Sequence, residues 1–158
     1  HAMAIAWLYR EEFARAEVKL ATVVDLSGRT AGVVAVAFEA MARFAGPWRH
    51  VTALIGPHIG ACCYEVDAPV IERLRVRFAT SLDAALSPAR PDHSMLDLQA
   101  LVRMELRGAG VGSAEVGSFP DACTCCDAER FHSYRRDGAR AGRLLHWIAA
   151  NAVTPPVP

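Results

Sequence analysis

The cysteines of this 158-residue chain fall in two short clusters. Cys62 and Cys63 are adjacent, and the second cluster, Cys123-Thr-Cys125-Cys126, contains a Cys-x-x-Cys pair. Four thiolates could hold zinc in a tetrahedral site. Adjacent cysteines in a strand or turn tend to point in opposite directions, so both rarely bind one ion. The spacing therefore favours core or loop thiols over a zinc site.

A cysteine could instead act as a nucleophile. That role needs a nearby base and a positive environment that lowers the pKa of the thiol. His58 and His132 are the candidate bases, but spacing alone places neither beside a cysteine. For His132, a strand position with a satisfied hydrogen bond is the simpler interpretation.

Two adjacent arginines form the third candidate site, in Ser133-Tyr134-Arg135-Arg136-Asp137-Gly138. A guanidinium group donates two parallel hydrogen bonds, so paired arginines at the end of a strand suit phosphate or carboxylate. The alternative is a solvent-exposed turn with an Arg–Asp pair.

A loop with several glycines lies in the middle of the chain. The apolar run Val51–Ile55 ends in Gly56-Pro57, and Gly60 interrupts the chain again before Cys62 and Cys63. Gly and Pro are strong local breaks, so the pattern predicts a shaped loop between rigid elements, where sites are often found. The alternative is a tight connection between a strand and a helix, with two buried cysteines.

Composition predicts one globular domain. The chain is 53% hydrophobic and 22% charged, with 17 basic and 17 acidic residues and no net charge. Nucleic-acid and membrane-surface binders need a basic excess, so neither partner is expected. No apolar run has the length of a membrane span, and residues 10–12 are charged where a signal peptide would be apolar. Reduced thiols in a cytoplasm are therefore expected.

The pattern of residues predicts a single domain of helices and strands over residues 3–150. Residues 1–2 are interpreted as a tag remnant and residues 151–158 as a flexible tail. Periodicity and propensity predict helices at 3–18, 30–44, 66–79 and 99–107, and strands at 20–26, 51–55, 96–98, 114–119, 131–135 and 143–150. An irregular excursion is predicted at 81–94, a cysteine-bearing loop at 120–127, and a hairpin-type turn at Asp137-Gly138.

Two long motifs resemble one known family. Residues 55–66, Ile-Gly-Pro-His-Ile-Gly-Ala-Cys-Cys-Tyr-Glu-Val, are similar to the Ile-Gly-Pro-x-Ile-Gly-x-Cys-Cys-Tyr-Glu-Val motif of the laccase-domain family. That family, also called multicopper polyphenol oxidoreductase-like, includes purine nucleoside phosphorylases and the peptidoglycan editing factor. Residues 123–127, 129–138 and 142–143 resemble its C-terminal block. The resemblance covers about residues 51–148, and residues 30–45 resemble the helix that precedes the first motif.

The resemblance implies a mixed α/β fold and phosphorolysis of adenosine, inosine or guanosine, with adenosine deamination as a related activity. It also implies a zinc site, and copper oxidase activity has been attributed to the family. The family's metal ligands lie in Gln-Val-His-Gly, Thr-Ala-Asp-Cys and His-Ala-Gly-Trp-Arg-Gly motifs. Residues 2–49 contain no Cys or His, and residues 23–28 read Val-Val-Asp-Leu-Ser-Gly where the last motif would fall. No metal ligand and no cofactor are therefore expected in this chain, which is interpreted as diverged or shortened at its N-terminus.

Within that resemblance, Arg135 and Arg136 are the predicted phosphate ligands, with Tyr134 shaping the pocket. His58 and Glu65 are candidates for polar or catalytic contacts in the glycine loop, and Cys62 and Cys63 are assigned to structure. The expected partners are a purine nucleoside and phosphate, with self-association left open. The rival hypothesis is a non-catalytic scaffold or assembly partner, and a four-cysteine zinc protein is a third. The predicted roles of these site residues require the glycine loop and the arginine pair to lie close together in the folded protein.

Overall fold

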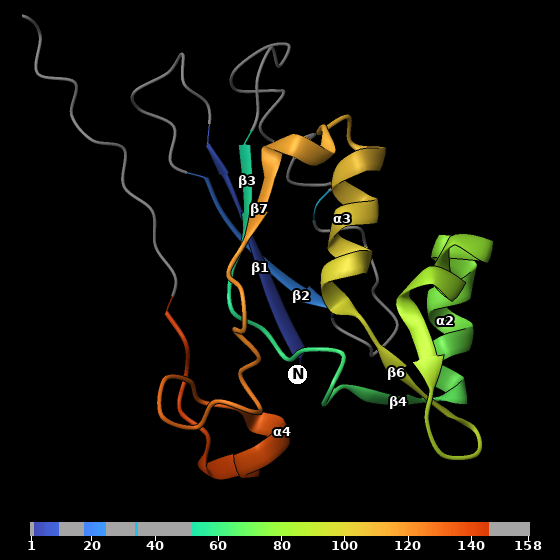
Figure 1. The fold of residues 1–158 in the computed structure, drawn as a ribbon, viewed down its shortest axis with the longest axis vertical. Coiled ribbons are helices and arrows are strands. Elements are labelled where there is room, and N and C mark those ends of the chain that lie inside the picture. Colours follow the sequence, from blue (N-terminus) through green and yellow to red (C-terminus); the bar gives the residue numbers. More distant parts are fainter. Residues whose placement is uncertain (1, 10–17, 25–33, 35–51, 146–158) are drawn as a thin grey trace, which may run out of the picture.

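The computed structural model describes residues 2–9, 18–24, 34 and 52–145 (Figure 1). The first sheet has the strand order β2-β1-β3-β7. Its strands are β1 (Ala2–Tyr9), β2 (Val18–Val24), β3 (Thr52–Ile55) and β7 (Val116–Ser118). β1 pairs antiparallel with β2 and β3, whereas β3 and β7 run parallel. The carboxyl ends of β3 and β7 therefore lie at the same edge of the sheet.

A smaller antiparallel sheet has the order β4-β6-β5. It consists of β4 (Glu65–Asp67), β5 (Leu86–Pro88) and β6 (His93–Leu96). A 3-10 helix, Ala79–Ala85, leads into β5, and a second one, Ser113–Glu115, leads into β7.

Two amphipathic helices pack around a common core. α2 (Ala68–Phe78) and α3 (Leu98–Gly108) start at Asp67 and Asp97, whose carboxylates accept hydrogen bonds from the amides of the first helical turn. Such N-caps satisfy amides that have no partner inside the helix. After α3, Gly110 turns the chain at φ +91°, a conformation that favours glycine. Figure 1 shows α3 between the first sheet and α2.

The core between the second sheet and these helices is apolar. Its fully buried leucines are Leu74, Leu82, Leu96 and Leu98, and Ile59 and Tyr64 of the glycine loop belong to the same cluster. The loop is therefore packed against the core on one side, which fixes its position relative to α2 and α3.

The mixed helix-and-sheet fold class is confirmed. The strands at 20–26 and 51–55 and the helices at 66–79 and 99–107 are confirmed with small shifts of their ends, and the strand at 114–119 is shorter. The strand at 96–98 is shifted, because β6 ends at Leu96 and Asp97 caps α3. Of the predicted helix at 30–44 only Val34 is described, and it is helical and buried. The tail at 151–158 and most of the strand at 143–150 lie outside the described residues.

Four local predictions are wrong. In the predicted helix at 3–18, residues 3–9 form a strand instead, because pairing of β1 on both sides overrides the helix propensity of its Ala and Leu residues. Residues 10–17 lie outside the described residues, and β2 starts at Val18. The excursion at 81–94 contains β5, the first half of β6 and part of a 3-10 helix. The strand at 131–135 gives way to a helical turn, α4 (Tyr134–Asp137), and a 3-10 turn, Gly138–Arg140, takes the place of the hairpin.

Within the part of the chain that is described, no helix has both the length and the apolar character needed to cross a membrane.

Candidate thiol and arginine site

The glycine loop and the cysteine loop meet beyond the parallel strands β3 and β7. Figure 1 shows the two segments that leave these strands running side by side, and His58 and Cys123 form an isolated parallel bridge. The Thr124 amide donates to His58 O at 2.9 Å. A Cβ at Gly60 would lie 3.3 Å from Cys123 Cβ and from Cys62 Sγ, so a larger residue would require these cysteine side chains to shift by a few tenths of an ångström.

This contact places four sulfurs in one group. The Sγ atoms of Cys62, Cys63, Cys123 and Cys126 all lie within 4.8 Å of one another. The Sγ–Sγ distances are 3.6 Å for Cys62–Cys123, 3.5 Å for Cys62–Cys126 and 3.3 Å for Cys63–Cys126. All four are free thiols, because a disulfide needs sulfurs about 2.05 Å apart.

The expectation that the adjacent pair points in opposite directions is therefore wrong. Residues 61–63 form a turn in which the amides of Cys63 and Tyr64 both donate to Gly60 O at 3.0 Å. Side-chain alternation applies to extended backbone, and this turn is not extended. Both sulfurs consequently reach Cys126 or Cys123, so the four-cysteine group that the sequence analysis considered and disfavoured does come together.

The thiols differ in proton affinity. Burial, with hydrogen bonds to Cys126 and Cys123, raises the pKa of Cys62 to about 11, and burial with a bond to Cys126 also raises the pKa of Cys63. At Cys123, burial alone would raise the pKa. The amides of Gly60, Cys126 and Cys125 outweigh it because they point at the sulfur, and the pKa falls to about 7. Gly60 N lies 3.2 Å from that sulfur.

Cys125 stands apart from the group. Its side chain packs against the apolar core cluster, and it is not among the four clustered sulfurs. Among the described residues, no hydrogen bond joins His58 or His132 to a thiol. His58 Nδ1 donates to Gly56 O at 2.9 Å, and His132 is exposed. The nucleophile hypothesis therefore has no base placed for it here.

Arg136 holds the cysteine loop in shape. Its Nη1 group donates to Thr124 O at 2.9 Å and Cys125 O at 3.0 Å, and Nη2 donates to Phe131 O at 2.9 Å. Nε and Nη2 also donate to the Asp137 carboxylate, at 2.9 and 2.8 Å. These contacts use all five N–H donors of a guanidinium group.

Arg135 reaches back to the glycine loop. Its guanidinium carbon lies 5.2 Å from the centre of the Tyr64 ring, and Nη1 donates to Glu65 O at 3.1 Å. Tyr64 is buried, and its hydroxyl has no hydrogen-bond partner within the described ranges. Burial raises the pKa of Tyr64, and Arg135 partly offsets that rise. The predicted convergence of the loop and the arginine pair is thus confirmed as direct contact.

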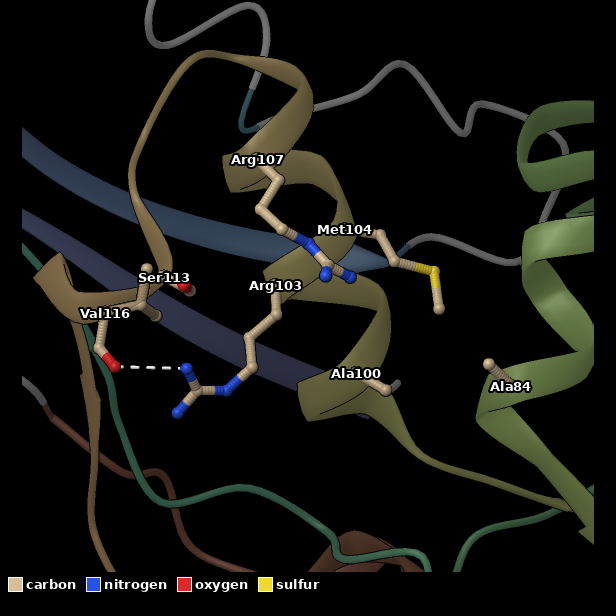
Figure 2. A pocket seen from close by; sticks show the side chains of 7 residues that line it. All are labelled: Ala84, Ala100, Arg103, Met104, Arg107, Ser113 and Val116. Carbon is tan, nitrogen blue, oxygen red and sulfur yellow. Dashed lines mark hydrogen bonds between the residues drawn. The ribbon is translucent and has the colours of Figure 1, made fainter.

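Glu65 and Tyr134 are the remaining predicted site residues. The Glu65 carboxylate pairs with Arg90 at 3.0 Å, and Tyr134 is exposed. No predicted site residue lines the cavity of about 220 Å³ beside α3, where Arg103 donates to Val116 O at 3.1 Å (Figure 2). Its lining is completed by Ala84, Ala100, Met104, Arg107 and Ser113.

Comparison with known proteins identifies the family. Residues 26–151 match the sequence model of the multi-copper polyphenol oxidoreductase laccase family. The chain belongs to this family. The match includes both the glycine loop and the cysteine and arginine segment, so the contact described above joins two parts of one laccase domain.

Curated relatives carry the name purine nucleoside phosphorylase. The chain is 36% identical over 94 residues to YlmD of Geobacillus stearothermophilus, covering 60% of this chain and 34% of that protein. It is 34% identical over 141 residues to a Mycobacterium tuberculosis relative, covering 85% of this chain and 51% of that protein. The chain therefore spans about a third to a half of the length of these relatives.

Solved structures share the fold. The crystal structure of the hypothetical protein YfiH of Bacillus licheniformis superposes with a TM-score of 0.69 and 26% identity, covering 85% of this chain and 49% of that chain. A Neisseria meningitidis protein gives a TM-score of 0.64 at 26% identity, covering 87% and 52%. This laccase domain thus has relatives of known architecture.

The family name implies copper, which has its own preferred ligands. In the described part of the domain, the group of potential ligands that comes together consists of four cysteines and no histidine. Copper(II) favours tetragonal sites of nitrogen and oxygen ligands, or blue-copper sites of two histidines and one cysteine. These residues do not fit such a centre, and the resemblance assigns the family's own ligands to motifs absent from residues 2–49.

Proposed function

We propose that this domain takes part in the phosphorolysis of purine nucleosides, with Arg135 binding the phosphate. In that reaction a phosphate oxygen forms a bond to C1′ of the ribose while the bond from C1′ to the purine nitrogen breaks. The electron pair leaves with the purine, which takes up a proton, and the products are ribose 1-phosphate and the free base. No oxidant or reductant is needed. The names of the relatives support this reaction class.

The position of Arg135 carries the proposal. Its side chain is exposed, and the hydrogen bond to Glu65 O uses only one of its five donors. A guanidinium fixed at one corner can present its other edge to a phosphate as two parallel hydrogen bonds. Electrostatic stabilisation of the phosphate and fixed orientation of its attacking oxygen would both lower the barrier.

The neighbouring groups take secondary roles. Arg136 has no N–H left over, so binding phosphate there would require breaking its bonds to the cysteine loop. We therefore assign Arg136 to positioning, and Tyr134 to shaping the pocket beside Arg135. His58 and Glu65 are kept as polar contacts. With Nδ1 donating to Gly56 O, His58 Nε2 carries a lone pair that can accept from a ribose hydroxyl.

The test measures release of hypoxanthine from inosine by the purified chain in the presence of phosphate. We expect release of hypoxanthine that depends on phosphate. The release should be slow, because the family's metal-ligand motifs are absent from residues 2–49. Arg135→Ala should raise KM for phosphate by about 10- to 100-fold, the equivalent of losing one or two charge-assisted hydrogen bonds. KM for inosine should change little.

Arg75→Ala is the matched control, since Arg75 is an exposed arginine on α2 that pairs with Asp83 at 2.9 Å. It should leave both KM values unchanged. Equal effects of the two substitutions would contradict the role of Arg135. If folded wild-type chain neither releases hypoxanthine nor binds phosphate, the enzymatic proposal fails and a non-catalytic scaffold or assembly partner is the better hypothesis.

A further inference from the structure

We propose that Cys62, Cys63, Cys123 and Cys126 bind one zinc ion as four thiolates, and that this ion has a structural role. The proposal does not depend on phosphorolysis, because none of the four sulfurs takes part in that reaction as written above. It assigns a function to a cluster that the arginine site leaves unused.

Distances are the first argument. Four sulfurs about 2.3 Å from a zinc ion at tetrahedral angles lie roughly 3.8 Å from one another. The observed separations of 3.3, 3.5 and 3.6 Å, with all six pairs within 4.8 Å, are close to that figure. Small rotations of the cysteine side chains would bring the sulfurs onto one tetrahedron.

Backbone geometry is the second argument. Each pair of cysteines sits on a turn that is closed by its own backbone hydrogen bonds: Cys63 N to Gly60 O at 3.0 Å and Asp127 N to Cys123 O at 3.1 Å. Gly60 N also donates to Cys123 Sγ at 3.2 Å. An amide that donates to sulfur stabilises the charged thiolate, so the backbone is arranged for an anionic sulfur at this position.

Charge is the third argument. Without a cation, four thiolates this close would repel one another strongly, and four neutral thiols would make only weak hydrogen bonds to one another. Zinc binding removes the repulsion and replaces the weak contacts: four S–H bonds break, four Zn–S bonds form, and four protons pass to solvent. Cys62 and Cys126 are exposed, so the ion can reach the site from solvent.

The donor set indicates the metal and the role. Tetrahedral sites of four sulfurs are typical of zinc and of iron–sulfur proteins, and a site closed by four protein ligands leaves no position for substrate. The ion would instead join the turn before Tyr64 to the loop whose carbonyls Arg136 holds. It would thereby fix the surface on which Arg135 lies.

The first test is metal analysis of wild-type chain purified without chelator. We expect about one zinc per chain, and no stoichiometric iron or copper. Replacement by cobalt should give the intense visible absorption of tetrahedral cobalt thiolate. With zinc bound, four of the five thiols should react slowly with an alkylating reagent, and chelation should release them.

Adjacent cysteines supply the matched variants. Cys126→Ser removes an exposed proposed ligand, and Cys125→Ser removes its neighbour, which faces the core. Changes in residues that only support a metal ligand weaken affinity by about 10- to 100-fold. Loss of a ligand itself in Cys126→Ser should exceed that, whereas Cys125→Ser should retain zinc.

Three results would overturn the proposal. One is wild-type chain that remains folded and binds neither zinc nor cobalt. Another is equal zinc affinity for Cys126→Ser and Cys125→Ser. The third is a stoichiometric disulfide between two of the four clustered cysteines in protein purified under reducing conditions. Because the wild-type measurements need no substitution, they decide the question even if a variant fails to fold.

Discussion

At the scale of single residues, identical neighbours have different surroundings. Arg135 and Arg136 are adjacent, yet Arg136 donates to three backbone carbonyls and one carboxylate, while Arg135 makes one backbone hydrogen bond and stacks over Tyr64. On a short helical turn, successive side chains point about 100° apart, so one faces the cysteine loop and the other faces the glycine loop. This geometry is the basis for proposing that Arg135 binds phosphate and that Arg136 positions the cysteine loop.

Nearby residues of α2 also differ in burial, and therefore in their contribution to stability. Leu74 is 1% exposed in the core, whereas Val76, two residues later, is 90% exposed. Leu74→Ala should lower the free energy of unfolding by about 2–5 kcal/mol, because it removes buried methyl groups and leaves a cavity. Val76→Ala should change it by less than about 0.5 kcal/mol. Urea denaturation checks both values, and similar losses for the two would contradict the placement of α2 against the core.

At the scale of elements, the cysteine loop and α4 are held by side chains that bond to backbone. Arg130 Nη2 donates to Asp121 O at 3.0 Å, and Arg136 binds the carbonyls of Thr124, Cys125 and Phe131. Apart from the bridge at His58, this segment pairs with no strand among the residues described. Its conformation therefore depends on a few guanidinium groups.

Replacing the Arg136 fork should loosen the segment without unfolding the domain. Arg136→Lys keeps the charge, but a lysine offers one nitrogen and no planar fork. We expect faster amide hydrogen exchange at residues 123–127 and unchanged exchange in α3, measured by mass spectrometry. Arg140→Lys, at an exposed position of the next turn, is the control. Equal protection of the loop in both variants would show that Arg136 is not its main support.

At the scale of the whole molecule, two strands that run parallel in the first sheet bring distant segments together. β3 and β7 are separated by 60 residues that include α2, α3 and the second sheet. Their carboxyl ends deliver the glycine loop and the cysteine loop to one place, where the proposed zinc ion would cross-link them. Bringing the ends of a long loop together costs conformational entropy when the chain folds, and the free energy of zinc binding would offset part of that cost.

The stability of the whole domain should consequently depend on zinc. A ligand that binds only the folded state stabilises it by about 2.7 kcal/mol at one hundred times its Kd. We expect chelation to lower the Tm of wild-type chain and added zinc to restore it, measured by differential scanning calorimetry. Cys126→Ser should not respond to either treatment. An unchanged Tm on removal of stoichiometric zinc would mean that the ion does not support the fold.

Sequence reasoning reached most of the elements that surround the site. The apolar run at β3, the periodic faces of α2 and α3 and the glycine breaks are local signals, because burial on one side of an element leaves a repeat in the chain. The helix expected over β1 failed because strand pairing is a non-local interaction. The strand expected at 131–135 failed because Arg136 satisfies the carbonyls of the cysteine loop from a helical turn.

The sequence by itself determined the family, the mixed helix-and-sheet class and the two motifs that carry the candidate chemistry, since these are written in residue identity and order. Only the tertiary structure decided which cysteines face one another and which arginine remains available. Those outcomes depend on the turn at Gly60, on the parallel pairing of β3 and β7 and on a closed set of guanidinium hydrogen bonds. The turn fixes backbone angles that no spacing rule specifies, and the strand pairing joins residues far apart in the chain. The Arg136 contacts are closer in sequence, but they depend on where the loop carbonyls lie in space.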